Sequence, residues 1–251
     1  DSSTSRGLGD VYKRQEQENK DKLDENKLIV CLDAGHGGKD NGSDYRLRYE
    51  KNDNLKITQA VAAYLADKEN IQVIMTRSDD TFLSLEERTS FANQNNADYF
   101  VSLHRNTGEG NGVETWIRSD ADDKTQALAK NIMDNLDAAG ISRNRGVKKG
   151  TQKSESKDYY VNLHTNMPAC IVELGFMNSP TDNQLFDANI DSYAKAIGDA
   201  VLKTYESYGK DGADAKESVE DVPGTEEQTS TETGTGTTGP VSYTHLRAHE
   251  T

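Results

Sequence analysis

Short apolar runs alternate with segments of helical periodicity along the middle of the chain. Six runs have the length and composition of buried strands, and they cover residues 28–32, 71–76, 98–104, 113–117, 159–163 and 169–174. Apolar residues recur at helical spacing over residues 53–69, from 84 onward, and over 122–139, 181–188 and 190–208. Strands that alternate with helices are joined by right-handed crossovers into parallel sheets. We therefore expect one α/β domain with a mostly parallel, twisted six-stranded sheet and helices on both faces.

Local signals place several helix boundaries. Ser84-Leu-Glu-Glu87 has the form of a capping box and predicts a helix start, with Leu85 and the aliphatic stem of Arg88 on its buried face. Asn52 or Asp53 is expected to cap the helix over 53–69. Gly140 suits the left-handed position that ends the helix over 122–139.

The two ends of the chain contain too few apolar side chains to build a core. Residues 1–26 are polar, and residues 210–251 contain a stretch rich in Thr, Gly and Glu, so we expect both ends to be disordered, the second as a linker. Segments 5–15 and 241–251 also resemble translated sequencing-adaptor sequence, which indicates a non-native leader and tail. The domain is therefore expected over residues 27–209.

Charge and hydropathy exclude some classes of partner. The net charge is −14, of which residues 1–26 contribute −2 and residues 210–251 contribute −6, leaving −6 for residues 27–209. A mildly acidic domain without a basic stripe argues against nucleic acid as a partner. No apolar run approaches the ~20 residues that span a bilayer, and we expect a monomer.

Cys31 and Cys170 each lie inside an apolar run. A free, buried thiol is the favoured interpretation of each. A buried disulfide and metal ligation remain open, so two cysteines do not identify a redox compartment.

Four residues with metal-binding or proton-transfer chemistry are predicted to meet at one edge of the sheet. His36, His104 and Glu173 each follow or close a predicted strand, and Glu50 lies in the loop before a helix. Open α/β sheets bind ligands at the carboxyl ends of their strands. His36, Glu50 and His104 form a chemically suitable zinc set, and Glu173 is the candidate general acid/base.

The spacing alone leaves other interpretations open. The three candidate ligands are separated by 14 and 54 residues, unlike a compact helical zinc motif. Either histidine could instead be a structural hydrogen-bonding residue, and Glu50 could be solvated. Asp33 is expected either to orient a ligand histidine or to form a turn, and His164 is a competing ligand.

Six motifs, in order, resemble the zinc-dependent N-acetylmuramoyl-L-alanine amidases of bacteria, a family of cell-wall enzymes. The motifs are Leu32-Asp-Ala-Gly-His-Gly-Gly38, Glu50-Lys-Asn-Asp-Asn-Leu55, Leu83-Ser-Leu-Glu-Glu-Arg88, Ser102-Leu-His-Arg-Asn106, Gly112-Val-Glu-Thr-Trp116 and Met167-Pro-Ala-Cys-Ile-Val-Glu-Leu-Gly-Phe176. The resemblance covers essentially residues 28–208 and implies an α/β catalytic domain with a six-stranded sheet.

The resemblance also implies the chemistry of the site. One Zn²⁺ would be held by His36, Glu50 and His104, with Glu173 as catalytic acid/base, for cleavage of the amide between N-acetylmuramic acid and L-alanine. Arg105 departs from the small residue common at this position in relatives, and it is expected to bind a carboxylate of the stem peptide. Peptidoglycan as substrate places the protein outside the cell or in the envelope. A zinc peptidase or deacetylase, and a catalytically silent wall-binding module, are the alternatives.

Overall fold

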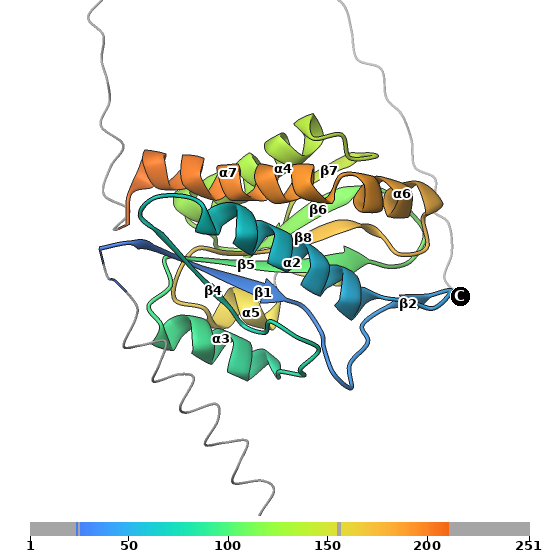
Figure 1. Cartoon of the computed structure of the whole chain (residues 1–251), viewed down its shortest axis with the longest axis horizontal. Coiled ribbons are helices and arrows are strands. Elements are labelled where there is room, and N and C mark those ends of the chain that lie inside the picture. The colour runs from blue at the N-terminus through green and yellow to red at the C-terminus, as the bar shows by residue number, and fades with distance from the viewer. Residues whose placement is uncertain (1–23, 25, 155–156, 211–251) are drawn as a thin grey trace, which may run out of the picture. The chain divides into compact units, whose positions relative to one another are not determined.

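A computed structural model describes residues 24, 26–154 and 157–210. A six-stranded sheet in the order β4-β1-β5-β8-β6-β7 forms the centre of the domain (Figure 1). Neighbouring strands are parallel except β6 and β8, which are antiparallel. The strands are β1 Leu28–Ala34, β4 Ile71–Met75, β5 Tyr99–Asn106, β6 Val113–Ile117, β7 Asn144–Lys149 and β8 Ala169–Phe176. The predicted fold class is confirmed, whereas the expectations for residues 1–23, 25 and 211–251 lie outside the described residues.

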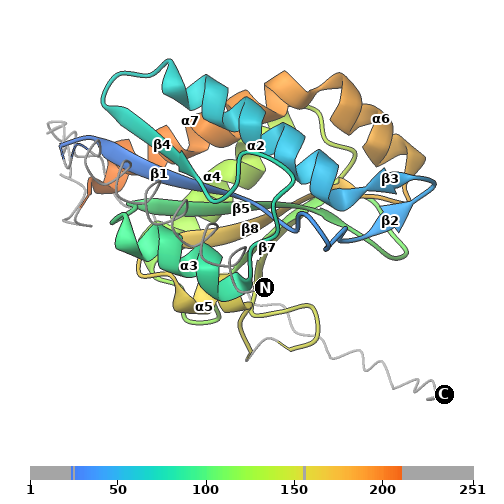
Figure 2. The same ribbon diagram turned by 60° about the horizontal axis from the view of Figure 1, so that its bottom comes forward.

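Helices cover both faces of this sheet. Helices α2, α4, α6 and α7 lie on one side, and α3 and α5 lie on the other (Figure 1, and turned by 60° in Figure 2). Their bounds are α2 Glu50–Ala66, α3 Leu85–Gln94, α4 Asp123–Ala138, α5 Tyr160–His164, α6 Pro180–Ala188 and α7 Ile190–Tyr208. No helix in the described part of the chain is long and apolar enough to cross a membrane.

Strand β1, which lies between β4 and β5, is buried on both faces, because all seven of its residues are buried. Its alternate residues enter two separate apolar clusters, with Leu28, Val30 and Leu32 in one and Ile29 and Cys31 in the other. A strand covered on both faces has a continuous apolar run instead of an alternating one. Cys170 belongs to the cluster opposite that of Cys31, and both thiols are free, as predicted.

The predicted strand over 159–163 is wrong, since this segment forms the short helix α5. A short apolar run does not by itself distinguish a strand from a buried helical turn. The sixth strand is β7 instead, at the edge of the sheet. Its sequence Asn-Arg-Gly-Val-Lys-Lys is polar and none of its residues is buried, so it carries no apolar signal.

The helix boundaries agree with the local signals except at α2. Ser84 and Glu87 form the predicted capping box of α3, although Leu85 is 53% exposed instead of buried. Helix α2 begins at Glu50, earlier than Asn52 or Asp53, after a hairpin of β2 Asp44–Tyr45 and β3 Arg48–Tyr49. Its N-cap residue, Tyr49, makes no side-chain cap. Glu50 is thus held on the first turn of a helix, not in a loop.

Candidate metal centre

Three side chains from distant segments converge near the carboxyl ends of β1 and β5. One ligand atom from each of His36, Glu50 and His104 lies within 4.8 Å of the others. Glu50 Oε1 is 3.2 Å from His36 Nε2 and 2.9 Å from His104 Nδ1. The two imidazole rings are edge-to-face, with centroids 5.0 Å apart. A single cation is therefore within reach of all three groups.

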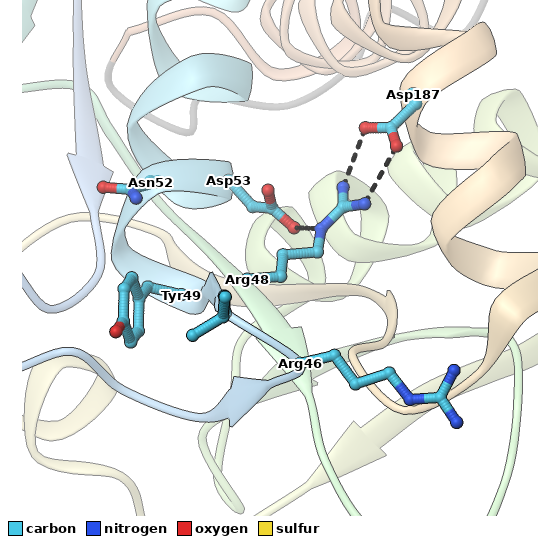
Figure 3. A pocket seen from close by; sticks show the side chains of 7 residues that line it. Arg46, Arg48, Tyr49, Asn52, Asp53 and Asp187 are labelled. Carbon is cyan, nitrogen blue, oxygen red and sulfur yellow. Dashed lines mark hydrogen bonds and ion pairs between the residues drawn. The ribbon is translucent and has the colours of Figure 1, made fainter.

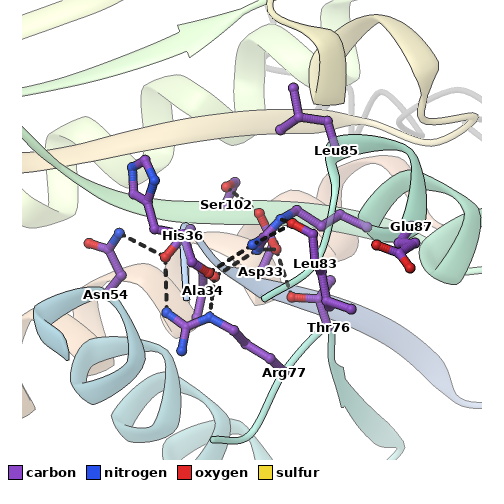
Figure 4. Close-up of polar contacts among 12 residues, drawn as sticks. Asp33, Ala34, His36, Asn54, Thr76, Arg77, Leu83, Leu85, Glu87 and Ser102 are labelled. Carbon is purple, nitrogen blue, oxygen red and sulfur yellow. Dashed lines mark hydrogen bonds and ion pairs between the residues drawn. The ribbon is translucent and has the colours of Figure 1, made fainter. Parts of the chain in front are cut away.

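The loop that carries His36 is fixed by hydrogen bonds to its backbone carbonyls (Figure 4). Arg77 donates from Nε to the carbonyl of Ala34 and from Nη2 to that of Gly35. Arg88 donates to the carbonyls of Ala34 and His36, each at 2.8 Å. Both arginines are buried, so the predicted burial of only the stem of Arg88 is wrong. Satisfied carbonyls hold this loop in one conformation.

Asp33 connects that loop to the rest of the sheet. Its carboxylate accepts hydrogen bonds of 2.6 Å from Thr76, Ser102 and Arg88. Burial would raise the pKa of Asp33, but the Arg88 charge and these donors hold it below its ordinary value. Neither role expected from the sequence, orienting a ligand or forming a turn, describes these contacts. Asp33 instead joins β1 to the residue that follows β4, to β5 and to α3 behind the site.

Two glycines leave the space that the cluster occupies. A Cβ built on Gly35 would lie 2.1 Å from His104 Cε1 and Nε2. A Cβ on Gly42 would lie 2.5 Å from His36 Cδ2 and 2.6 Å from Glu50 Oε2, and its φ of +63° is a conformation that favours glycine. The close approach of the three side chains therefore depends on the absence of side chains here.

Neighbouring groups orient the candidate ligands. His36 Nδ1 lies 2.8 Å from Asp40 Oδ2, which directs Nε2 toward Glu50. Glu50 Oε2 accepts from the Ser43 amide at 2.8 Å, and Oε1 accepts from Asn54 Nδ2 at 3.2 Å. Such outer contacts fix the ring orientation and tautomer of metal-binding histidines.

The charges in the cluster are strongly coupled. Although burial alone would raise the pKa of Glu50, hydrogen bonds and charges from His104 and His36 hold it well below its usual range. Burial alone would lower the pKa of His36, but Glu50 and Asp40 raise it to about 9. The Glu50 carboxylate therefore stays ionised between two imidazoles. The His, Glu, His donor set fits a divalent cation such as zinc, whose binding would displace the proton that His36 otherwise holds.

Glu173 lies next to this cluster, on β8. It is the register partner of His104 on one side and of Glu114 on the other. Its Oε2 atom is buried, with no hydrogen-bond partner in the described part of the chain. Burial raises the pKa of Glu173 to about 7, with the Glu50 and Glu114 charges acting in the same direction and the His104 charge opposing them. A carboxyl group that titrates near neutrality can both accept and donate a proton.

The sequence-based prediction missed a second polar group beside Glu173. Glu114 is 2% exposed, and it accepts hydrogen bonds from Asn106 Nδ2 at 3.0 Å, Trp116 Nε1 at 3.1 Å and Arg145 Nε at 2.6 Å. A glutamate inside the apolar run of residues 113–117 was the available signal, because a buried carboxylate needs partners.

Arg105 and His164 do not join the site. The Arg105 side chain is 0% exposed and bonds Asp53 at 2.5 Å and Asn183 at 2.7 Å, with its guanidinium over the Phe186 ring. This inward placement argues against the expected contact with a stem-peptide carboxylate. His164 is exposed and stacks on Tyr160.

A shallow pocket adjoins the β2–β3 hairpin (Figure 3). Arg48 crosses it, with Nε 2.6 Å from Asp53 and its two Nη atoms 2.8 and 2.9 Å from Asp187. Arg48 thus bonds carboxylates from both α2 and α6, and these bonds hold the hairpin that precedes Glu50 in place.

Comparisons with known proteins show which family the chain resembles. The sequence model of a family described as N-acetylmuramoyl-L-alanine amidase matches residues 30–203. A crystal structure of such an amidase from Clostridium difficile 630 is 34% identical, with a TM-score of 0.68, over 73% of this chain and 100% of that one. The catalytic domain of CwlV from Paenibacillus polymyxa is 32% identical, with a TM-score of 0.62, over 70% of this chain and 96% of that one.

Curated relatives differ in how much of their length is matched. The YqiI protein of Bacillus subtilis (strain 168) is 36% identical over 182 residues, which are 71% of this chain and 84% of YqiI. The probable cell wall amidase LytH of Staphylococcus aureus is 33% identical over 62% of this chain. The chain spans half the length of LytH.

Proposed function

Since the chain belongs to the N-acetylmuramoyl-L-alanine amidase family and is an enzyme of that class, we propose that it hydrolyses the amide between N-acetylmuramic acid and L-alanine in peptidoglycan. Zinc is the proposed cofactor, one ion held by His36, Glu50 and His104. Glu173 is the proposed acid/base. One observation carries the proposal. The partly buried Glu173 is the register partner of His104, and His104 converges with His36 and Glu50 on a candidate metal site.

A bound zinc ion would act as a Lewis acid toward a carbonyl oxygen and would lower the pKa of a water bound to it to about 7. The protein contributes the orientation of the ligands. His36 presents Nε2 because Asp40 holds Nδ1, and Glu50 is fixed by the Ser43 amide and Asn54.

Glu173 performs the proton transfers. Its carboxylate accepts a proton from the attacking water and returns it to the L-alanine nitrogen as the C–N bond breaks. Burial raises the pKa of Glu173 above the ordinary value of a carboxyl group, which favours a group that both takes up and returns a proton. The atom Oε2, which has no partner among the described residues, is the acceptor available for that proton.

Peptidoglycan glycan strands with their stem peptides are the proposed substrate, which places the protein in the envelope or outside the cell. We propose that it acts as a monomer, with residues 27–209 as its catalytic domain.

Mass spectrometry of digested cell wall tests the reaction. The chain loaded with zinc should release stem peptides with a free L-alanine amino group, chelation should stop the release, and added zinc should restore it. Metal-dependent turnover with a different product would assign the site to a peptidase or deacetylase. A chain that binds wall without any product would be a binding module.

A further inference from the structure

A row of charged side chains extends from the metal cluster toward the edge strand β7. His104, Glu173 and Glu114 are consecutive register partners on β5, β8 and β6. Residues directly opposite each other on neighbouring strands project from the same face of a sheet. Arg145 of β7 reaches back to this row and donates from Nε to Glu114 Oε2 at 2.6 Å. The row thus ends in a cation, which Glu114 separates from the proposed acid/base Glu173.

Arg145 uses only part of its hydrogen-bonding capacity inside the protein. Its guanidinium lies 5.0 Å from the centre of the Phe176 ring, and its side chain is 29% exposed. Within the described residues, no acceptor is bonded to Nη1 or Nη2. Phe176 and Glu114 fix the plane of the guanidinium, and its outer pair of donors has the fork geometry that binds a carboxylate in bidentate fashion.

Gly110 keeps that outer edge uncovered. A Cβ at this position would lie 3.6 Å from Arg145 Nη1 and 3.1 Å from Phe176 Cζ. The chain therefore passes the guanidinium with no side chain to block it. By contrast, Arg48 and Arg105 bond carboxylates of the protein through their Nη atoms.

The strand spacing limits which substrate group could reach Arg145. Neighbouring strands are about 4.8 Å apart, so a guanidinium bonded to Glu114 is about 5–10 Å from the Glu173 carboxyl group. An extended peptide advances about 3.3–3.6 Å per residue. A carboxylate on the second stem residue, which follows L-alanine, would lie about 5–10 Å from the amide that is cleaved, by the same estimate. Groups further along the stem peptide would lie beyond the reach of Arg145.

We propose that Arg145 binds a free carboxylate on the second residue of the stem peptide and thereby makes the enzyme selective for stems that carry this acid over stems in which it is an amide. This inference rests on the proposed function, because it assumes that a muramyl peptide occupies the site. Arg145 is a specificity-determining residue in this assignment. A role limited to neutralising Glu114 would instead affect both substrates equally.

The test compares two synthetic muramyl peptides that differ only in a carboxylate or a carboxamide on the second stem residue. With the zinc-loaded full chain, kcat/KM should favour the acid by about tenfold to hundredfold, the range expected for hydrogen bonds to a charged group. Arg145→Gln should abolish this preference by raising KM for the acid alone. Arg145→Lys keeps the charge beside Glu114 but loses the fork, so it should retain only part of the preference.

Arg143→Gln is the matched control, since it removes the same charge from an exposed residue two positions away. It should keep the full acid preference. A second readout needs no turnover: the metal-free chain should bind the released acid peptide more tightly than the amide peptide, and Arg145→Gln should remove the difference.

The outcomes separate the two proposals. Equal kcat/KM for both peptides in the wild-type chain, or an unchanged ratio in a folded Arg145→Gln or Arg145→Lys variant, would overturn the role of Arg145. Failure of the zinc-loaded wild-type chain to cleave either peptide would instead overturn the proposed function.

Discussion

Glu173 and His104 are direct register partners on the parallel strands β8 and β5. The distance between the proposed acid/base and one proposed metal ligand is therefore set by a strand pairing in the centre of the sheet, not by a loop. Sites built on strands hold their geometry more closely than sites on loops. The chemistry is positioned by the most rigid part of the fold.

Replacing Glu173 by Gln should abolish turnover without removing the metal. The amide keeps the shape of the side chain but cannot accept the proton, and loss of a general acid/base costs about 10²–10⁴ in kcat. Turnover is measured as product release from cell wall, and zinc content by elemental analysis. Glu109→Gln, at an exposed position, should leave both unchanged. A loss of zinc from the Glu173 variant would show that this residue is a ligand instead.

His104→Ala should reduce zinc binding and remove the stabilisation that zinc gives. A ligand that binds only the folded state stabilises it by about 2.7 kcal/mol at 100 times its Kd. The unfolding midpoint of the wild-type chain should therefore rise with zinc, whereas that of His104→Ala should not. His164→Ala, which alters an exposed histidine outside the cluster, should behave like the wild type. Equal responses in all three proteins would rule out the proposed centre.

Gly35→Ala should weaken metal binding while the chain still folds. The added methyl group would overlap the His104 imidazole, 2.1 Å from Nε2, and the ring would have to turn away from Glu50. Gly108→Ala is the control for backbone strain away from the cluster, because nothing lies within 4 Å of a Cβ there while its φ of +107° disfavours an alanine. Calorimetric titration with zinc gives the two affinities. Unchanged affinity in a folded Gly35 variant would mean that His104 does not need its present position.

The stability of the metal-free chain should depend on Glu173 between pH 4.5 and 7. Burial raises the folded-state pKa of Glu173 from 4.5 to about 7, so its contribution to stability is complete below pH 4.5 and is lost as the pH rises through 7. The loss is about 2–3 kcal/mol. The raised pKa of His36 also lowers stability as the pH rises, but at higher pH. This effect is the same in the Glu173→Gln variant used for comparison.

Urea unfolding of the metal-free wild type and of Glu173→Gln isolates this contribution. The free energy of unfolding of the wild type should fall relative to that of the variant as the pH rises over this range. Curves that remain parallel would mean that Glu173 has an ordinary pKa.

Arg105→Met should lower stability more than it changes substrate binding. The substitution removes a fully buried guanidinium from Asp53 and Asn183, and breaking a buried pair costs about 3 kcal/mol or more. Arg46→Met, at an exposed position of the hairpin turn, should cost little. Chemical unfolding measures the first effect and KM the second. A raised KM with an unchanged unfolding curve would restore the substrate-binding role that the sequence suggested for Arg105.

The parts of the fold that the sequence predicted well are those with a strong local signal. Strand β1 was evident from its uninterrupted apolar run, and the start of α3 from the Ser84 capping box. Strand β7 was missed because an edge strand with polar residues has no such signal, and α5 was mistaken for a strand because its apolar run is short. Both errors concern segments whose structure is decided by tertiary contacts.

The candidate site shows the same limit. His36, His104 and Glu173 could be placed at one edge because each follows an apolar run. The contacts of Arg105 could not be predicted, because an arginine after a strand has the same local sequence whether it points to solvent or to Asp53. The apolar run around Glu114 signalled a buried carboxylate, but its position beside Glu173 depends on strand register, which no local pattern reports.

The hydrogen bonds from Arg77, Arg88 and Asn54 to the carbonyls that precede and include His36 have a consequence for how the proposed metal site would take up a cation. A binding loop that is already ordered loses little conformational entropy when its ligand arrives. Uptake should then proceed without a folding step, so that one divalent metal can replace another in the finished protein. The metal bound in the cell would then depend on which divalent metals are available and on which of them the donor atoms prefer. The conformation of the loop would be the same with each metal.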